Sequence, residues 1–169
     1  MARIVGTEGA DWGDPDYPAG TNSADTIYGL GGADSIDGRG GNDTIDGGAD
    51  TDWISGGAGN DWIAGQEGDD VLDGDYPSWG PPVSGGNDRL YGGEGNDYLD
   101  GEGGNDRLSA GPGDDTLLDW NGNNTLIGGE GNDWMASGDG NDRHLAGAGN
   151  DTLIDYGGAN RLDGGEGDD

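Results

Sequence analysis

The chain has 169 residues, 42 of them glycine, and a formal net charge of −30 at pH 7. Only 29% of its residues are apolar, whereas a compact domain usually holds about 45–50%. The absence of cysteine excludes disulfides and thiolate metal sites, and so acidic a chain would repel nucleic acid and anionic lipid. This composition is typical of a disordered tail unless cations neutralise the carboxylates.

Residues 1–19 form an irregular start to the chain. Ile4 and Val5 favour a short strand, and residues 14–18 read as a turn-rich cap. Because solenoids need atypical ends to cover their core, we interpret 1–19 as an irregular N-terminal cap. The start lacks the apolar stretch of a signal peptide, and no apolar run approaches the roughly 20 residues that span a bilayer.

From residue 20 onward one nine-residue pattern repeats, Gly-Gly-x-Gly-x-Asp-x-apolar-x, most clearly in GGEGNDWMA at 128–136. Asp fills 14 of the 17 positions spaced by nine from Asp25 to Asp169, and an aliphatic residue follows two positions later in nearly every unit. A period held this long indicates a repeat architecture. The three exceptions at the Asp position are Trp79, Asn124 and Asn160.

The pattern resembles the calcium-binding nonapeptide repeats of the RTX (repeats-in-toxin) family over residues 20–169. The resemblance implies an all-β fold, a right-handed parallel β-roll or solenoid with two nonapeptide units per 18-residue turn. It also implies Ca²⁺ in the turns and type I secretion, hence an extracellular location, secreted or at the cell surface. Since the family's export signal normally follows the repeats and this chain stops in mid-repeat, we expect a fragment.

Each unit is expected to divide into a six-residue loop and a three-residue strand whose middle residue points inward. Residues 18 apart should then stack in two outward columns. Four of the six arginines fall in one column, which supports a period of 18. That column is Ser35, Trp53, Val71, Arg89, Arg107, Thr125, Arg143 and Arg161, and the other is Thr26, Thr44, Trp62, Gly80, Tyr98, Thr116, Trp134 and Thr152.

Three stretches depart from the repeat. Residues 74–82 are interpreted as a degenerate half-turn loop, with Tyr76 and Trp79 packed over the gap or, alternatively, forming an aromatic ligand-binding loop. Residues 119–127 and 155–163 are interpreted as degenerate units, because Asn stands at their Asp positions. Asp119 and Asp155 are candidates to compensate for the lost carboxylates.

By resemblance to the family, the Asp at position six of each unit is the side-chain ligand, and neighbouring glycines supply carbonyl oxygens. A hard cation with 6–8 oxygen ligands fits this donor set, which favours calcium over magnesium or zinc. Pairs of Asp 18 residues apart give up to about ten sites. One edge would pair Asp34/Asp52, Asp52/Asp70, Asp70/Asp88 and Asp88/Asp106, and the other Asp25/Asp43, Asp43/Asp61, Asp97/Asp115, Asp115/Asp133, Asp133/Asp151 and Asp151/Asp169. The expected metal-binding residues are these Asp residues with Asp142, Gly38, Gly41, Gly56, Gly59, Gly65, Gly68, Gly92, Gly95, Gly101, Gly104, Gly128 and Gly131.

The sequence offers no nucleophile motif and one histidine, His144, at an inward core position, so we expect no enzyme. The favoured function is a monomeric calcium-binding module that folds when it binds Ca²⁺. The alternative is a β-solenoid adhesin, or a carbohydrate- or ice-binding surface, that uses the exposed Thr and aromatic face.

Overall fold

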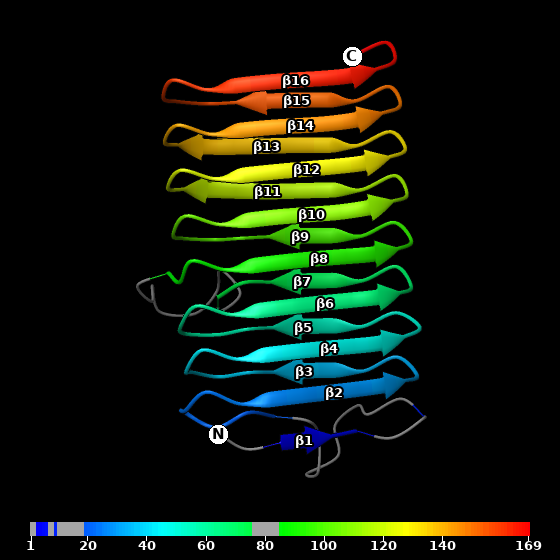
Figure 1. Ribbon diagram of the computed structural model, residues 1–169, viewed down its shortest axis with the longest axis vertical. Coiled ribbons are helices and arrows are strands. Elements are labelled where there is room, and N and C mark those ends of the chain that lie inside the picture. Colours follow the sequence, from blue (N-terminus) through cyan, green and yellow to red (C-terminus); the bar gives the residue numbers. More distant parts are fainter. Residues whose placement is uncertain (1–2, 7–8, 10–18, 76–84) are drawn as a thin grey trace.

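The protein is a stack of parallel strands wound into two facing sheets (Figure 1). The computed structural model describes residues 3–6, 9, 19–75 and 85–169. Within these ranges every named element is a strand, and no helix could cross a membrane. Sheet A contains β1 (Arg3–Val5), β2 (Thr26–Gly31), β4 (Thr44–Ala49), β6 (Trp62–Glu67), β8 (Arg89–Glu94), β10 (Arg107–Pro112), β12 (Thr125–Glu130), β14 (Arg143–Ala148) and β16 (Arg161–Glu166). Sheet B contains β3 (Ser35–Asp37), β5 (Trp53–Ser55), β7 (Val71–Asp73), β9 (Tyr98–Asp100), β11 (Thr116–Asn121), β13 (Trp134–Asp139) and β15 (Thr152–Asp155).

This parallel solenoid with 18-residue turns confirms the predicted fold class. Each turn crosses once through sheet A and once through sheet B, so β2 pairs with β4 and β3 with β5. The expected three-residue strand is correct for β3, β5, β7 and β9 but too short for most strands of sheet A, which are six residues long. There the pairing continues past the core residue into the glycine positions, as between Gly111 and Gly129.

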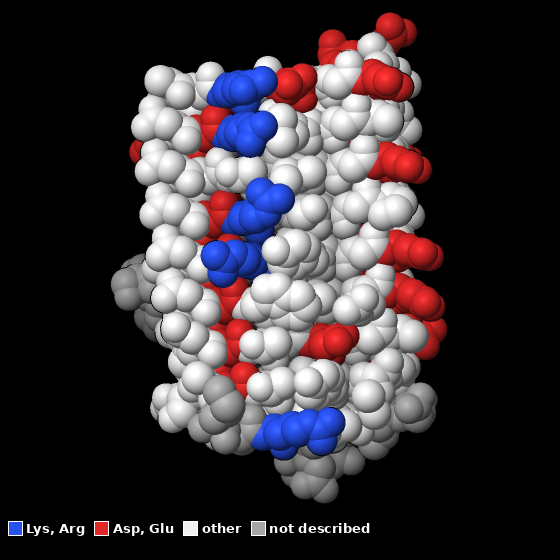
Figure 2. Space-filling view, viewed as in Figure 1, with Lys and Arg blue, Asp and Glu red and all other residues white. Residues whose placement is uncertain are grey.

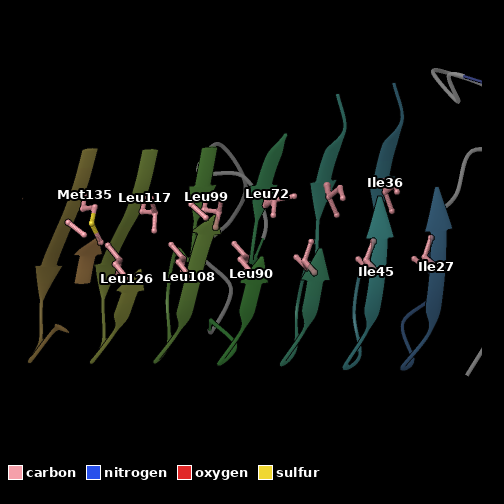
Figure 3. Close-up of a cluster of buried hydrophobic side chains, with 14 residues drawn as sticks. Ile27, Ile36, Ile45, Leu72, Leu90, Leu99, Leu108, Leu117, Leu126 and Met135 are labelled. Atoms are coloured by element: carbon pink, nitrogen blue, oxygen red, sulfur yellow. The ribbon is translucent and has the colours of Figure 1, made fainter. Parts of the chain in front are cut away.

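The core lies between the sheets as two rows of aliphatic side chains (Figure 3). Ile27, Ile45 and Leu108 on sheet A and Leu99 and Leu117 on sheet B have no exposed surface. Each side chain of this kind contributes roughly 1.5–3 kcal/mol when it is buried. The core is therefore one residue wide per half-turn, which explains how a chain so poor in apolar residues can form it.

The register changes once along the solenoid. Trp62 on β6 pairs with Arg89 on β8, and Val71 on β7 pairs with Tyr98 on β9, so these partners are 27 rather than 18 residues apart. Nine additional residues therefore lie in one loop between Gly74 and Asp88, instead of replacing a half-turn. Residues 76–84, with Tyr76 and Trp79, lie outside the described residues.

The extra nine residues exchange the two faces, so the predicted outward columns are wrong beyond Val71. The four arginines still share a face, on β8, β10, β14 and β16, where they form a visible column (Figure 2). Sheet A presents Thr26, Thr44, Trp62, Arg89, Arg107, Thr125, Arg143 and Arg161, and sheet B presents Ser35, Trp53, Val71, Tyr98, Thr116, Trp134 and Thr152.

The two ends of the stack differ. β1 pairs in parallel with β2, and Ile4 packs against the core beneath Ile27. In the last turn Leu162 is 44% exposed. Residues 10–18, the greater part of the expected N-terminal cap, lie outside the described residues.

Candidate metal centres

The repeated Asp residues form ladders along both edges of the solenoid. Beyond the first turn, the Oδ1 of a ladder Asp accepts the backbone N–H of the Asp or Asn one turn earlier, as Asp115 does from Asp97 at 2.7 Å. Up to Asp151 these side chains are almost fully buried, and Asp34 and Asp52 have no exposed surface. One carboxylate oxygen thus ties successive turns together. The other oxygen, Oδ2, is buried without a hydrogen-bond partner in Asp43, Asp52, Asp61, Asp70, Asp88, Asp97, Asp106, Asp115, Asp133, Asp142 and Asp151.

The unpartnered Oδ2 atoms face small spaces that glycines keep open. A Cβ built on Gly56 would lie 2.6 Å from Oδ2 of Asp61 and 2.5 Å from the carbonyl oxygen of Gly74. The same construction on Gly74 would meet Oδ2 of Asp88 at 2.7 Å and the carbonyl oxygen of Gly101 at 3.0 Å. Carboxylate and carbonyl oxygens therefore converge where a side chain would otherwise stand. This donor set suits a hard cation.

The predicted glycine positions fall into two groups. The first glycine of a unit borders the oxygen-lined space, where an added Cβ would meet an Asp Oδ2. The fourth-position glycine has a positive φ, such as 144° at Gly59, and packs on the backbone of the preceding turn. The first group contains Gly38, Gly56, Gly65, Gly92, Gly101 and Gly128, and the second contains Gly41, Gly59, Gly68, Gly95, Gly104 and Gly131.

The electrostatics of the ladders are unfavourable without a cation. Burial raises the pKa of Asp97 and Asp115 to about 6 and that of Asp88 to about 8. The backbone N–H of the preceding Asp offsets part of each pKa shift, and neighbouring carboxylates add to it. Each loop therefore favours a bound positive charge or a proton.

The ladders differ from the predicted pairs at the loop. The pairing of Asp70 with Asp88 is wrong, because Asp70 donates to Asp97 and Asp61 donates to Asp88. One ladder consequently consists of Asp at every position: Asp34, Asp52, Asp70, Asp97, Asp115, Asp133, Asp151 and Asp169. The other contains both asparagines: Asp25, Asp43, Asp61, Asp88, Asp106, Asn124, Asp142 and Asn160.

No cluster of three or more carboxylate or imidazole side chains suited to a metal occurs in the described part of the chain. A cation in these loops would thus take carboxylates from at most two side chains and the remaining ligands from backbone carbonyls. That need explains why the pattern couples Asp to glycine.

Two groups of acidic residues lie outside the repeated Asp positions. Asp119 has no exposed surface, and burial, followed by the charge of Asp106, raises its pKa to about 10. At the foot of the inserted loop, burial and the charges of Glu102 and Asp100 raise the pKa of Asp73 to about 8. Asp119 could be noticed in the sequence, because it replaces the first glycine of a unit that has Asn124 in place of the usual Asp. Asp73 could not, because the change of register is what brings Glu102 and Asp100 close to it.

His144 occupies the inward position of β14, as predicted, with no exposed surface. Its Nε2 lies 2.9 Å from the Ser137 hydroxyl, which also donates to Oδ2 of Asp155 at 3.2 Å. The hydroxyl lies between imidazole and carboxylate, whereas in a catalytic triad the imidazole lies in the middle. The group is therefore a buried polar contact within the core.

Comparison with known proteins agrees with this geometry. The family described as RTX calcium-binding nonapeptide repeat (4 copies) matches residues 19–54, 46–75, 83–117, 121–143 and 145–169. No curated protein and no solved structure matches the chain. The matched segments cover most of the sequence and coincide with the Asp ladders, and the chain belongs to the RTX calcium-binding nonapeptide repeat family.

Proposed function

We propose that this chain is a calcium-dependent folding module of an exported protein. The low calcium of a cytosol leaves the chain unfolded and fit for export, by the type I route that the family resemblance implies. The higher calcium outside the cell then drives folding. Binding free energy becomes folding free energy, because the two halves of each site meet only in the folded stack.

The observation that carries this proposal is the column of buried Oδ2 atoms without hydrogen-bond partners. An unpaired buried carboxylate costs several kcal/mol of folding free energy. The narrow core buries too little apolar surface to offset this cost for many carboxylates. Ions between successive turns remove this cost, with Oδ2 atoms and first-position glycine carbonyls as ligands. Eleven successive Asp–Asp steps, four on one ladder and seven on the other, offer such positions.

Far-UV circular dichroism during a calcium titration tests the proposal. A coil spectrum in chelator that becomes β-rich with calcium, and not with equal magnesium, is the expected result. A spectrum that is equally β-rich in chelator at neutral pH refutes calcium-dependent folding. Sedimentation velocity in both states tests whether the folded module is monomeric.

A second candidate function is suggested by the arginine column. Arg89 lies directly opposite Arg107, and Arg143 lies opposite Arg161. Like charges in these positions destabilise a sheet. Within the described residues, Arg161 is the one member of the column with an ion pair, to Asp163 at 3.5 Å. Once calcium neutralises the carboxylates of the ladders, a linear anionic glycan running along the stack would fit this column.

A glycan array tests this second candidate, with Arg89→Gln/Arg107→Gln as the binding-defective variant and Arg39→Gln, on a loop, as the control. Binding to acidic glycans that only the double variant loses supports it, and an array without hits removes it. The ice-binding form has less support, because Thr26 and Thr44 are the one pair of threonines on successive turns among the paired strands that the structure describes.

A further inference from the structure

Asp119 stands where most units have their first glycine. Its counterpart one turn earlier is Gly101, and one turn later it pairs with Ser137. The Asp119 side chain has no exposed surface, and neither carboxylate oxygen accepts a hydrogen bond of normal geometry, although the Asp106 carboxyl group and the Asn121 N–H lie near enough to act on its pKa. A buried carboxylate in this state takes up a proton or binds a ligand that carries positive charge.

The Asp119 carboxylate points into the loop that contains Asp106. A Cβ built on Gly101 would meet Oδ2 of Asp119 before any other atom, with the Asp106 Cβ 3.1 Å away. Gly101 leaves this space open because it has no side chain. In regular units the same space faces the Oδ2 of the unit's own Asp.

The unit that gains a carboxylate at Asp119 is the one that lacks its usual carboxylate, because Asn124 stands at the Asp position. Asn124 keeps the structural contact, since its Oδ1 accepts the Asp106 N–H at 2.9 Å. Its Nδ2 lies 3.5 Å from the Asn121 carbonyl oxygen and cannot act as an anionic ligand. Two buried carboxylates nevertheless lie close together at this edge, one from Asp106 and one from Asp119.

We infer that a calcium ion binds between the loops of Asp106 and Asn124, with Asp106 and Asp119 as its acidic ligands. This site takes its second carboxylate from position one of a unit instead of position six. The inference rests on the proposed function, since it assigns one more ion to the same edge of the roll. It predicts that the ladder of Asp25 is loaded as far as the loop of Asn124.

The turn of Asn160 supplies a contrast. Asp155 stands five residues before Asn160, as Asp119 does before Asn124, but both of its oxygens accept hydrogen bonds. Oδ1 accepts the Gly157 N–H at 3.0 Å, and Oδ2 accepts the Ser137 hydroxyl at 3.2 Å. One turn before Asp155 stands Ser137, whereas one turn before Asp119 stands Gly101, which leaves open space. The turn of Asn160 therefore has an extra Asp but no second site for an ion.

Native mass spectrometry of the full chain, titrated with calcium alone, tests the site by counting bound ions. Asp119→Asn is expected to hold one ion fewer than the wild type, whereas Asp155→Asn holds the wild-type number. Asp119→Gly, which restores the usual glycine, should also lose one ion. Combining it with Asn124→Asp should restore the count. Circular dichroism in calcium verifies that each variant is folded.

The outcomes separate the two proposals. If the wild type binds several ions and both single Asp119 variants keep all of them, the site is refuted while the folding module stands. An equal loss in Asp155→Asn also contradicts the site, because that carboxylate is already hydrogen-bonded. If the wild type binds no calcium, the proposed function fails first.

Discussion

Asp61 donates its backbone N–H to Oδ1 of Asp88 at 2.7 Å across 27 residues, whereas Asp43 makes the equivalent bond to Asp61 across 18. The geometry of the two bonds is the same although the intervening chain is half as long again. The solenoid thus keeps its carboxylate ladder intact and places the nine additional residues in one loop. This change of register, which the bond from Asp70 to Asp97 shares, determines which Asp residues lie on one edge for the rest of the chain.

Deleting residues 76–84 should therefore preserve the fold. The junction reads Gly74-Asp75-Gly85-Gly86-Asn87-Asp88, a regular unit, so β6 to β8 becomes an ordinary 18-residue step. Shortening a loop lowers the entropic cost of closing it, by about 0.6 kcal/mol for each halving of its length, and so favours the folded state. We expect an unchanged β-rich spectrum in calcium and an equal or higher Tm. Loss of calcium-induced folding would contradict the assigned register.

The carboxylate charge, not the backbone hydrogen bond, should determine calcium affinity. Asp115→Asn keeps an oxygen for the Asp97 N–H but removes the charge from the buried Oδ2. We expect the calcium midpoint of folding to rise about tenfold, equivalent to about 1.4 kcal/mol, in a circular dichroism titration.

Asp114→Asn is the matched control for Asp115→Asn. Asp114 is the adjacent residue, is exposed, and accepts the backbone N–H of Asn132 at 2.7 Å. The substitution removes the same charge outside the oxygen-lined space. Equal shifts of the calcium midpoint in the two variants would show that general charge repulsion, and not ligation, sets the affinity.

The repeat and the inward aliphatic position could be predicted because both are periodic in the sequence, and the stacking by 18 residues could be predicted from the resemblance to the RTX family. The edge assignment could not, because insertion of nine residues preserves the phase of a nine-residue repeat. Because Trp79 stands nine residues after Asp70, the sequence predicts a degenerate unit at 74–82. In the structure, Gly74 and Asp88 belong to one unit with a longer loop. The role of Asp119 needed the structure as well, because its burial and missing hydrogen-bond partners are three-dimensional facts.

Protons should partly replace calcium in stabilising the roll. Burial raises the pKa of Asp43 and Asp97 to about 6 and that of Asp88 to about 8 from an ordinary 3.8. A raised folded-state pKa contributes stability that is complete below about pH 3.8 and is lost as pH rises through about 6 to 8. In chelator we expect β-structure near pH 4 that melts towards pH 8, followed by circular dichroism. The calcium midpoint should rise as pH falls through the same window. A coil at both pH values in chelator would contradict this.

Gln66 occupies a backbone position that favours glycine. Its φ is 92°, and its partners in the neighbouring strands are Gly48 and Gly93, with φ of 115° and 132°. A left-handed backbone costs a residue with a side chain about 1–2 kcal/mol, so Gln66→Gly should stabilise the calcium-loaded roll by about 1 kcal/mol. Urea unfolding at saturating calcium measures the change. Gln66→Ala keeps a Cβ and should bring no such gain, and equal gains in both variants would exclude backbone strain as the cause.

His144 should oppose the proton effect of the carboxylates. It has no exposed surface, and its Nδ1 has no hydrogen-bond partner. Burial lowers its pKa, an effect that Asp155 and Asp142 offset in part. A lowered folded-state pKa means that the associated stability is complete above the ordinary value near 6.5 and is lost as pH falls below it.

His144→Leu continues the aliphatic row of Leu126 and Leu162 in sheet A. Removing a buried unpartnered nitrogen should stabilise the roll by about 1 kcal/mol at pH 8. The gain should be larger at pH 5, because the His144 imidazole is protonated in the unfolded wild type but stays neutral when buried, which destabilises the wild-type fold. Thermal unfolding at both pH values in calcium measures the difference. A gain that is the same at both would mean that the imidazole does not titrate in this range, and a loss would mean that its contact with Ser137 outweighs the buried nitrogen.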